Sequence, residues 1–407
     1  MPSKRTQLID KRYVLPFILI TTLFFLWGFA RAILDVLNKH FQDELHISIT
    51  QSSLIQVTTY LGYFIMAIPA GMFINRYGYR RGVVFGLILF GLGALSFIPG
   101  MQVGTFNAFL VSLFVIGCGL VFLETAANPY ATELGPEATA SSRLNLSQTF
   151  NGMGCFMATF IVGQYLFRTD GTSGDVSVPY MVMGIIVLAV AVVFSFVDLP
   201  EIQQQKTDDD IATQPLSSRL KALFTHRSFV FGLIALLAYE VAEISINSYF
   251  VNFVTGEGWM DKNRASVIIS LALVIFMVGR FISSWIMRTV KAESLLCICA
   301  LMTMLCMLVV ILGLGRISVY ALVLNYLFEA MMFPTIFSLA LRSLGPLTKS
   351  ASSLLMMTPV GGCGFMLMGL MADQTGSMTL PFIIPLIGYA IVLAFAWSLT
   401  RKSQMKQ

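Results

Sequence analysis

The chain has 407 residues, of which 57% are hydrophobic and only 12% are charged, about half the charged share of an ordinary soluble domain. This composition excludes a water-soluble globule, a disordered chain and a disulfide scaffold, and it is typical of a polytopic helical membrane protein. The net charge of +5 does not indicate nucleic-acid binding, because the cations lie in short gaps between apolar runs and form no single patch.

Twelve apolar runs are each long enough to cross a bilayer core of ~30 Å as a helix. Helix is the expected form, because open strands in lipid would leave backbone groups unpaired and no run alternates as a barrel strand does. The predicted fold class is therefore all-α, with twelve transmembrane helices. The runs are residues 14–41, 52–75, 82–98, 106–131, 141–167, 178–197, 229–254, 265–287, 293–314, 318–341, 350–372 and 380–399.

The gaps between these runs differ in charge. Most of the 26 Lys and Arg residues lie at the two termini or in the even-numbered gaps. Because cytoplasmic loops carry the excess of Lys and Arg, both termini and the central loop are predicted to be cytoplasmic. The expected location is a cell membrane, the inner one in a bacterium. The first run is too long for a signal peptide and lacks a cleavage site.

Residues 198–228 form the only long polar stretch, with three consecutive acids at 208–210 and a short amphipathic piece at 218–224. This stretch divides the runs six and six, so we predict two six-helix bundles, 1–197 and 229–407, joined by a cytoplasmic linker. Such a division is typical of transporters whose substrate site lies between the halves. The alternative is two membrane domains without a shared cavity.

The six cysteines lie within apolar runs, and we interpret them as small hydrophobic residues. Cys297 and Cys299 have no accompanying His or second Cys pair, so no metal site is expected. The three histidines are peripheral and no nucleophile constellation is present, so neither an enzyme nor a cofactor is expected.

Charged side chains within a membrane are costly, ~2.5–3.5 kcal/mol each at mid-helix, so each one marks a candidate site. Asp35 lies four residues from both Arg31 and Lys39 and shares a helix face with them. It is either part of a structural ion pair near the outer end of the first run or a carboxylate at the mouth of a cavity. An adjacent arginine argues against Asp35 holding a proton for long.

Glu124, in the fourth run, has no cation three or four residues away. An isolated carboxyl in a low-dielectric interior is expected to carry a proton near neutral pH, the state that a proton-coupled carrier requires. The alternative is a protonated side chain that only bonds a neighbouring helix. Pro129 is expected to break the ladder of helical hydrogen bonds and free backbone groups near Asn128.

Asn145, Gln148 and Asn151 recur every three residues in the fifth run and form one polar stripe. Their amides offer both donors and acceptors, which suits a polyol, although contacts between helices are the alternative.

In the seventh run, Glu240, Glu243 and Asn247 share a face. The two acids could share a proton or pair with Arg280 of the eighth run, and we leave both options open. We include Glu243 and Asn247 among the candidate substrate contacts. Asn325 and Glu329, four residues apart in the tenth run, are ambiguous in the same way.

The segment 71–81 follows the second run, and its cations lie where a helix C-terminus and the cytoplasmic leaflet favour them. It resembles the loop motif of the major facilitator superfamily, G-x-x-x-D-R-x-G-R-R/K, with Asn75 in place of the Asp and Tyr79 within the basic end. We assign a gating or orienting role to Gly71, Arg76, Gly78 and Arg81.

A closer resemblance covers nearly the whole chain. Residues 123–129 (Leu-Glu-Thr-Ala-Ala-Asn-Pro) and 143–151 (Arg-Leu-Asn-Leu-Ser-Gln-Thr-Phe-Asn) are similar to the fucose–proton symporter family. The resemblance implies that a first-span Asp and a fourth-span Glu take part in proton coupling and sugar binding. These positions match Asp35 and Glu124, and the family's fifth-span amides match Gln148 and Asn151.

The sequence departs from the fucose transporter at polar positions. This chain reads Arg31-Ala-Ile-Leu where the fucose transporter is rich in Asn, and this chain also carries Glu240 and Glu243. A changed polar set alters which hydroxyls can be bound, so fucose itself is not carried over.

The function predicted is import of a monosaccharide by proton symport with alternating access. Sodium coupling, a drug exporter, a channel and a non-transporting sugar sensor are the alternatives. The expected partners are a sugar, protons and the lipid bilayer, with no nucleic acid, and the chain is expected to be a monomer. Sugar contacts are assigned to Asp35, Asn145, Gln148, Asn151, Glu243 and Asn247, and the proton to Glu124 and Asp35.

Overall fold

The fold is entirely helical over the part of the chain that the structure, a computed structural model, describes. That part comprises residues 9, 11–45, 47–103, 106–136, 139–166, 177–197, 216–256, 258–287, 289–342 and 344–404.

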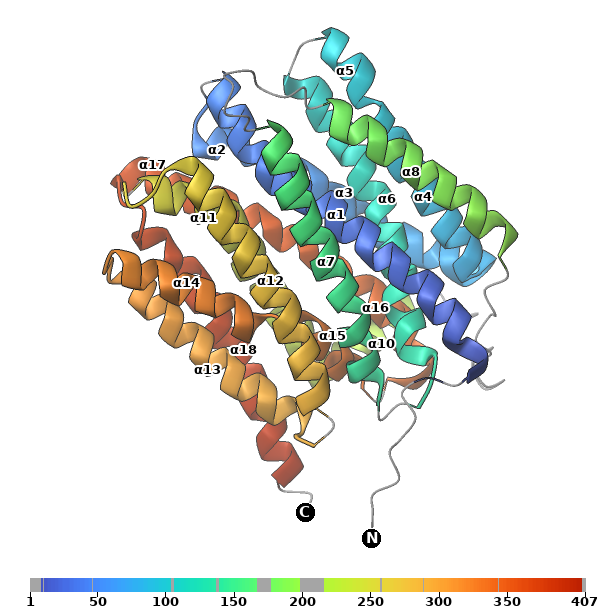
Figure 1. The fold of residues 1–407 in the computed structure, drawn as a ribbon. Coiled ribbons are helices and arrows are strands. Elements are labelled where there is room, and N and C mark those ends of the chain that lie inside the picture. The colour runs from blue at the N-terminus through green and yellow to red at the C-terminus, as the bar shows by residue number, and fades with distance from the viewer. Residues whose placement is uncertain are drawn as a thin grey trace.

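The first six predicted runs correspond to six long helices and two short ones that follow α1 and α4 (Figure 1). They are α1 Val14–Leu45, α2 Ile49–Ser52, α3 Leu54–Tyr77, α4 Tyr79–Leu95, α5 Phe97–Val103, α6 Phe106–Glu133, α7 Ala140–Leu166 and α8 Ser177–Phe196, preceded by the 3-10 turn η1 Lys11–Tyr13.

The remaining six runs follow α10, a short helix inside the predicted linker; residues 198–215 of that linker lie outside the described part. The helices are α10 Leu216–Thr225, α11 Arg227–Gly256, α12 Lys262–Ile286, α13 Ala292–Ile311, α14 Arg316–Glu329, α15 Met332–Leu341, α16 Thr348–Leu355, α17 Gly364–Thr375 and α18 Ile383–Gln404, with 3-10 turns η4 Gly345–Leu347, η5 Thr358–Cys363 and η6 Leu380–Phe382.

Eleven helical stretches of the described chain are long and apolar enough to span a membrane. The predicted span that is missing from these eleven is the fifth in chain order, α7. It is 27 residues long, but its first half is rich in Ser, Thr, Asn and Gln. It nevertheless packs along α1 and α12 (Figure 1), and its side chains Asn145, Ser147, Gln148 and Asn151 are buried. The predicted all-α, twelve-helix class is confirmed.

Helices of each half pack mainly on one another. In the first half α7 packs on α1, and α6 packs on α3 and α4; in the second, α18 packs on α11 and α13. The two halves meet where α7 lies against α12 and where α3 lies against α16 and η5. Any polar group on these facing surfaces therefore lies at the boundary between the halves.

The halves touch near both ends of the bundle. At the end where α7 begins and α12 ends, Ser142 and Ser284 share a hydrogen bond of 2.9 Å. At the opposite end, Thr50 of α2 donates to Asp373 of α17 at 2.5 Å.

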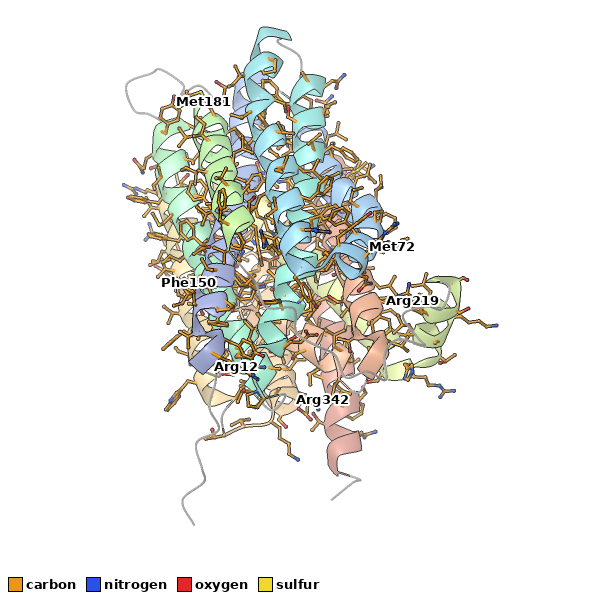
Figure 2. The ribbon with its side chains drawn as sticks, turned by 90° about the vertical axis from the view of Figure 1, so that its right-hand side faces the viewer. Arg12, Met72, Phe150, Met181, Arg219 and Arg342 are labelled. Carbon is orange, nitrogen blue, oxygen red and sulfur yellow. The ribbon has the colours of Figure 1, made fainter. Side chains whose placement is uncertain are left out.

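Arg12, Arg219 and Arg342 all lie in the lower half of Figure 2, far from Met181 at its top.

Two predicted spans are broken where the sequence suggested single helices. The tenth run divides into α14 and α15, and the eleventh into α16, η5 and α17. Conversely, α6 continues past Pro129 to Glu133. Proline removes one N–H from the ladder without ending the helix, and residues 116–131 of α6 are buried.

Candidate functional site

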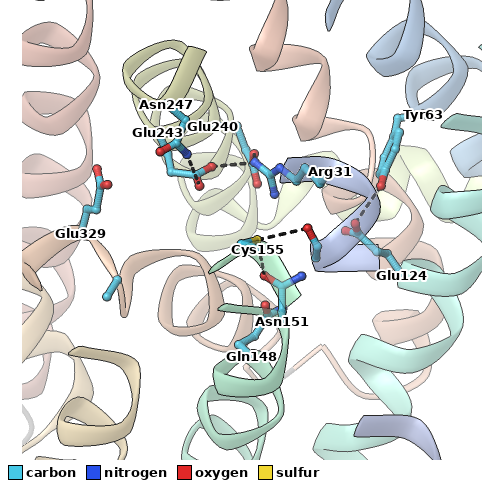
Figure 3. Close-up of polar contacts among 12 residues, drawn as sticks. Arg31, Tyr63, Glu124, Gln148, Asn151, Cys155, Glu240, Glu243, Asn247 and Glu329 are labelled. Carbon is cyan, nitrogen blue, oxygen red and sulfur yellow. Dashed lines mark hydrogen bonds and ion pairs between the residues drawn. The ribbon is translucent and has the colours of Figure 1, made fainter. Parts of the chain in front are cut away.

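Glu124 lies in the middle of α6 and is 4% exposed. Its Oε1 accepts a hydrogen bond of 2.8 Å from the hydroxyl of Tyr63, which projects from α3 (Figure 3). Tyr63 in turn packs against Tyr60, with ring centroids 5.7 Å apart. The acid thus has a neutral donor as its direct partner, which agrees with the absence of a nearby cation in the sequence.

Arg31 of α1 forms ion pairs with both acids of α11. Its Nη2 lies 3.2 Å from Glu240 Oε2 and 2.6 Å from Glu243 Oε2. Asn247, one turn further along α11, donates to the other oxygen of Glu243 at 2.9 Å. The sequence left open whether these two acids share a proton or pair with Arg280. The structure pairs them with Arg31 of the other half, not with Arg280 (Figure 3).

Arg280 of α12 instead binds the amides of α7. Its Nη1 donates to the backbone oxygen of Gln148 at 2.8 Å, to the side-chain oxygen of Gln148 at 3.0 Å and to Asn151 Oδ1 at 3.2 Å. Its Nε donates to Ala330 O at 2.9 Å, at the break between α14 and α15, and its guanidinium lies 4.3 Å from the ring of Phe276. A backbone carbonyl at the helix break is thereby satisfied by a buried cation.

The predicted polar stripe of α7 is buried at all three positions. Gln148 also donates to Asn128 of α6 at 3.3 Å, and Asn151 donates to the backbone oxygen of Phe24 in α1 at 3.3 Å. Asn145, fully buried, lies one turn nearer the start of α7. The structure thus brings Gln148 and Asn151 into one network with Arg280.

Another buried acid of the C-terminal half, Glu329, lies apart from the contacts of Arg31 and Arg280. Glu329, at the end of α14, accepts hydrogen bonds on Oε2 from Asn325 at 2.7 Å and from Tyr389 of α18. Figure 3 shows Glu329 away from the Arg31 contacts. Both partners of Glu329 are neutral. The sequence did not indicate Tyr389 as a partner, because it lies 60 residues from the acid in the chain.

Asp35 lies within α1, but its side chain is outside the described part of the structure. The loop motif is described in full. A side chain at Gly71 would meet Ser353 of α16, with its Cβ 1.9 Å from Ser353 Oγ, so α3 and α16 approach closely there. Gly78, with φ of +85°, links α3 to α4, a conformation that favours glycine. Arg76 and Arg81 are exposed.

Buried carboxyls, amides and arginines from both halves therefore meet at one boundary inside a bundle of apolar helices. Such a boundary between two six-helix halves, with broken helices beside it, is the arrangement of a secondary transporter. The sequence profile of the Major Facilitator Superfamily matches residues 20–362, and the chain belongs to this family of membrane transporters.

The chain is similar over almost its full length to characterised members of that family. It is 34% identical to the L-fucose-proton symporter of Escherichia coli, with 95% of this chain and 93% of that protein covered. It is 33% identical to a glucose/galactose transporter of Brucella abortus, covering 94% and 93% of the two chains.

Solved structures agree with this assignment. The structure of the E. coli fucose transporter FucP in the outward conformation matches with a TM-score of 0.80 and 33% identity, covering 95% of this chain and 99% of that one. A proton:xylose symporter, XylE, matches with a TM-score of 0.76 at 15% identity, a likeness of fold alone.

Proposed function

We propose that this protein imports a neutral monosaccharide together with protons, by alternating access across a bacterial inner membrane. The relatives named as symporters of fucose and transporters of glucose or galactose support a sugar as the substrate. The proposal includes the division at residues 1–197, 198–228 and 229–407, cytoplasmic termini, and a monomer in the lipid bilayer. Sodium coupling is the alternative that the experiment below distinguishes.

The observation that carries the proposal is the contact between Tyr63 and Glu124. A carboxyl that is 4% exposed and has a phenol as its direct partner can exist in the neutral form without leaving a cation unpaired. Binding and releasing a proton at Glu124 therefore changes the net charge of the boundary between the halves. A change of buried charge is what allows a symporter to reorient only when it is loaded.

The sugar contacts are proposed at the amides of α7. The side-chain oxygens of Gln148 and Asn151 accept bonds from Arg280 in the present state, and sugar hydroxyls would exchange with these bonds. Asn145, Glu243 and Asn247, with Asp35 on α1, complete the set of proposed contacts. Asp35 is proposed to act with Glu124 in proton coupling.

The test is uptake of labelled L-fucose, D-glucose and D-galactose into proteoliposomes that hold the purified protein, with a pH gradient and then with a protonophore. Uphill uptake of one of these sugars should disappear with the protonophore and should not require sodium. Glu124→Gln should abolish uphill uptake and keep exchange of labelled for unlabelled sugar. Glu293→Gln is the matched control, since Glu293 pairs with Arg342 (3.3 Å) away from the boundary. Normal accumulation by Glu124→Gln would contradict the proposal.

A further inference from the structure

The acidic pair of α11 has more negative charge than its partner can balance. Glu240 and Glu243 are one helical turn apart, and both contact the same nitrogen of Arg31. Their side chains are only 1% and 9% exposed. Two ionised carboxylates with one guanidinium would leave a net negative charge inside the protein, which is strongly unfavourable. One of the two acids should therefore hold a proton.

The contacts indicate which acid is protonated. Glu243 lies nearer to Arg31 and also accepts a hydrogen bond from Asn247, so its charge is well compensated. Glu240 has the longer contact, and its Oε1 has no hydrogen-bond partner among the described residues although the side chain is buried. An ionised oxygen without a donor is costly in such a place, whereas a neutral carboxyl is tolerated.

Charged groups act on Glu240 from three neighbouring parts of the protein. Arg31 comes from α1, Glu243 lies on the same helix, and Glu124 acts on Glu240 from α6. Tyr60 of α3 faces the guanidinium of Arg31, 6.0 Å away. On the side of η5, Gly361 packs against the Cβ of Glu240 and brings no charge. Arg31 is thus the cation on which the charge of Glu240 depends.

We propose that Glu240 is a second proton-binding carboxyl, in addition to Glu124. The proton of Glu240 crosses the membrane in each transport cycle together with that of Glu124. This inference rests on the proposed function. Arg31 extends from the first helix of one half to the first helix of the other. Loss of the proton from Glu240 strengthens this ion pair, and its return weakens it. The charge of Glu240 therefore controls how firmly α1 and α11 are joined. Two protons then enter with each sugar.

The number of protons per sugar is measured as the membrane potential at which net sugar flux in proteoliposomes is zero. With equal pH on both sides and a tenfold gradient of the sugar that the wild type accumulates, one charge per sugar balances at about 59 mV and two charges at about 30 mV. We expect about 30 mV for the wild type and about 59 mV for Glu240→Gln. The latter keeps the pair of Arg31 with Glu243.

Further variants separate Glu240 from the other buried acids. Glu243→Gln should also move the zero-flux potential to about 59 mV, because Glu240 must then stay ionised beside Arg31. Glu329→Gln is the matched control, since Glu329 is equally buried but has neutral partners, and it should stay at about 30 mV. A wild-type value of about 59 mV, or a shift in Glu329→Gln in place of Glu240→Gln, overturns the inference.

Infrared difference spectroscopy tests the proton without transport. At neutral pH, the spectrum of the wild type minus that of Glu240→Gln should contain the carbonyl band of a protonated carboxyl. Its absence overturns the inference even if transport is normal. Failure of the wild type to accumulate any of the three sugars would count against the proposed function, and the infrared band would still decide whether Glu240 holds a proton.

Discussion

Arg280 in α12 donates a hydrogen bond to the side-chain oxygen of Gln148 in α7 at 3.0 Å, so a cation of the second half is bound by an amide of the first. Arg31 makes the opposite connection, from α1 to the acids of α11. Each half thus contributes an arginine that bonds side chains of the other half. We expect the proposed reorientation to break or rearrange these two contacts, together with the Ser142–Ser284 and Thr50–Asp373 hydrogen bonds.

Replacing Arg280 with lysine should destabilise the protein. A lysine ammonium lacks the planar fork that lets the guanidinium bond Ala330 O and the α7 amides together. Loss of one such charged hydrogen bond should lower the free energy of unfolding by about 1.5–3 kcal/mol, measured as a lower thermal midpoint in detergent. Arg264→Lys is the control, because Arg264 has a side chain 78% exposed and should change stability by less than about 0.5 kcal/mol. An equal midpoint for both variants would disprove the role of Arg280.

Removing Arg31 should be costly unless an acid is removed with it. Arg31→Gln leaves Glu240 and Glu243 without their cation, and breaking a buried pair in this way costs about 3–5 kcal/mol. The double variant Arg31→Gln with Glu243→Gln should regain much of this stability. The comparison uses denaturation of the wild type, the two single variants and the double variant in the same detergent. If the double variant is as unstable as the sum of the two single ones, the acids and the arginine are not coupled.

The close approach of α1 and α7 should make Gly28 intolerant of any side chain. A Cβ at Gly28 would lie 2.2 Å from the backbone oxygen of Asn151, so alanine must push the two helices apart. We expect Gly28→Ala to cost about 1–3 kcal/mol and to reduce sugar uptake, because Asn151 shifts. Gly163→Ala on α7 is the control, since no atom of the described residues lies within 4 Å of its Cβ. Uptake by Gly28→Ala at the level of this control would contradict the packing.

The contact between α3 and α16 should permit a cross-link between the halves. The ideal Cβ of Gly71 lies 2.9 Å from the Cβ of Ser353, so a small shift brings cysteines at both positions to disulfide distance. Oxidation of the Gly71→Cys, Ser353→Cys double variant should stop sugar uptake, and a reducing agent should restore it. Each single variant should be insensitive to the oxidant. Full uptake in the cross-linked protein would mean that these helices need not separate.

Composition and periodicity were sufficient to predict the helices. All twelve apolar runs correspond to helical segments, because in lipid only backbone groups paired within each segment are stable. The absence of a cation within one helical turn of Glu124 was also evident in the sequence, because it depends on local spacing alone. The influence of Arg31, which acts on Glu124 from another helix, was not. The gating or orienting role assigned to Gly71 stays a prediction, although α3 and α16 approach closely at that residue.

Contacts between distant segments could not be predicted in this way. The partner of Glu240 is 209 residues away in the chain, and that of Arg280 is 132 residues away, distances at which spacing carries no information. Tyr63, the donor to Glu124, is 61 residues away from that acid in the chain. At the break between α14 and α15, the backbone oxygen of Ala330 accepts a hydrogen bond from Arg280, a side chain of another helix that the local sequence does not indicate.

The order of Arg31 and its partner acids along the chain also has a consequence for biogenesis. The ribosome makes the N-terminal half first, at ~5–20 residues per second, so the 209 residues that separate Arg31 from Glu240 correspond to about 10–40 s of synthesis. During this interval the nascent first helix carries a cation whose carboxylates from α11 have not yet been made. Its ion pairs with Glu240 and Glu243 can therefore form only after the seventh helix has been made.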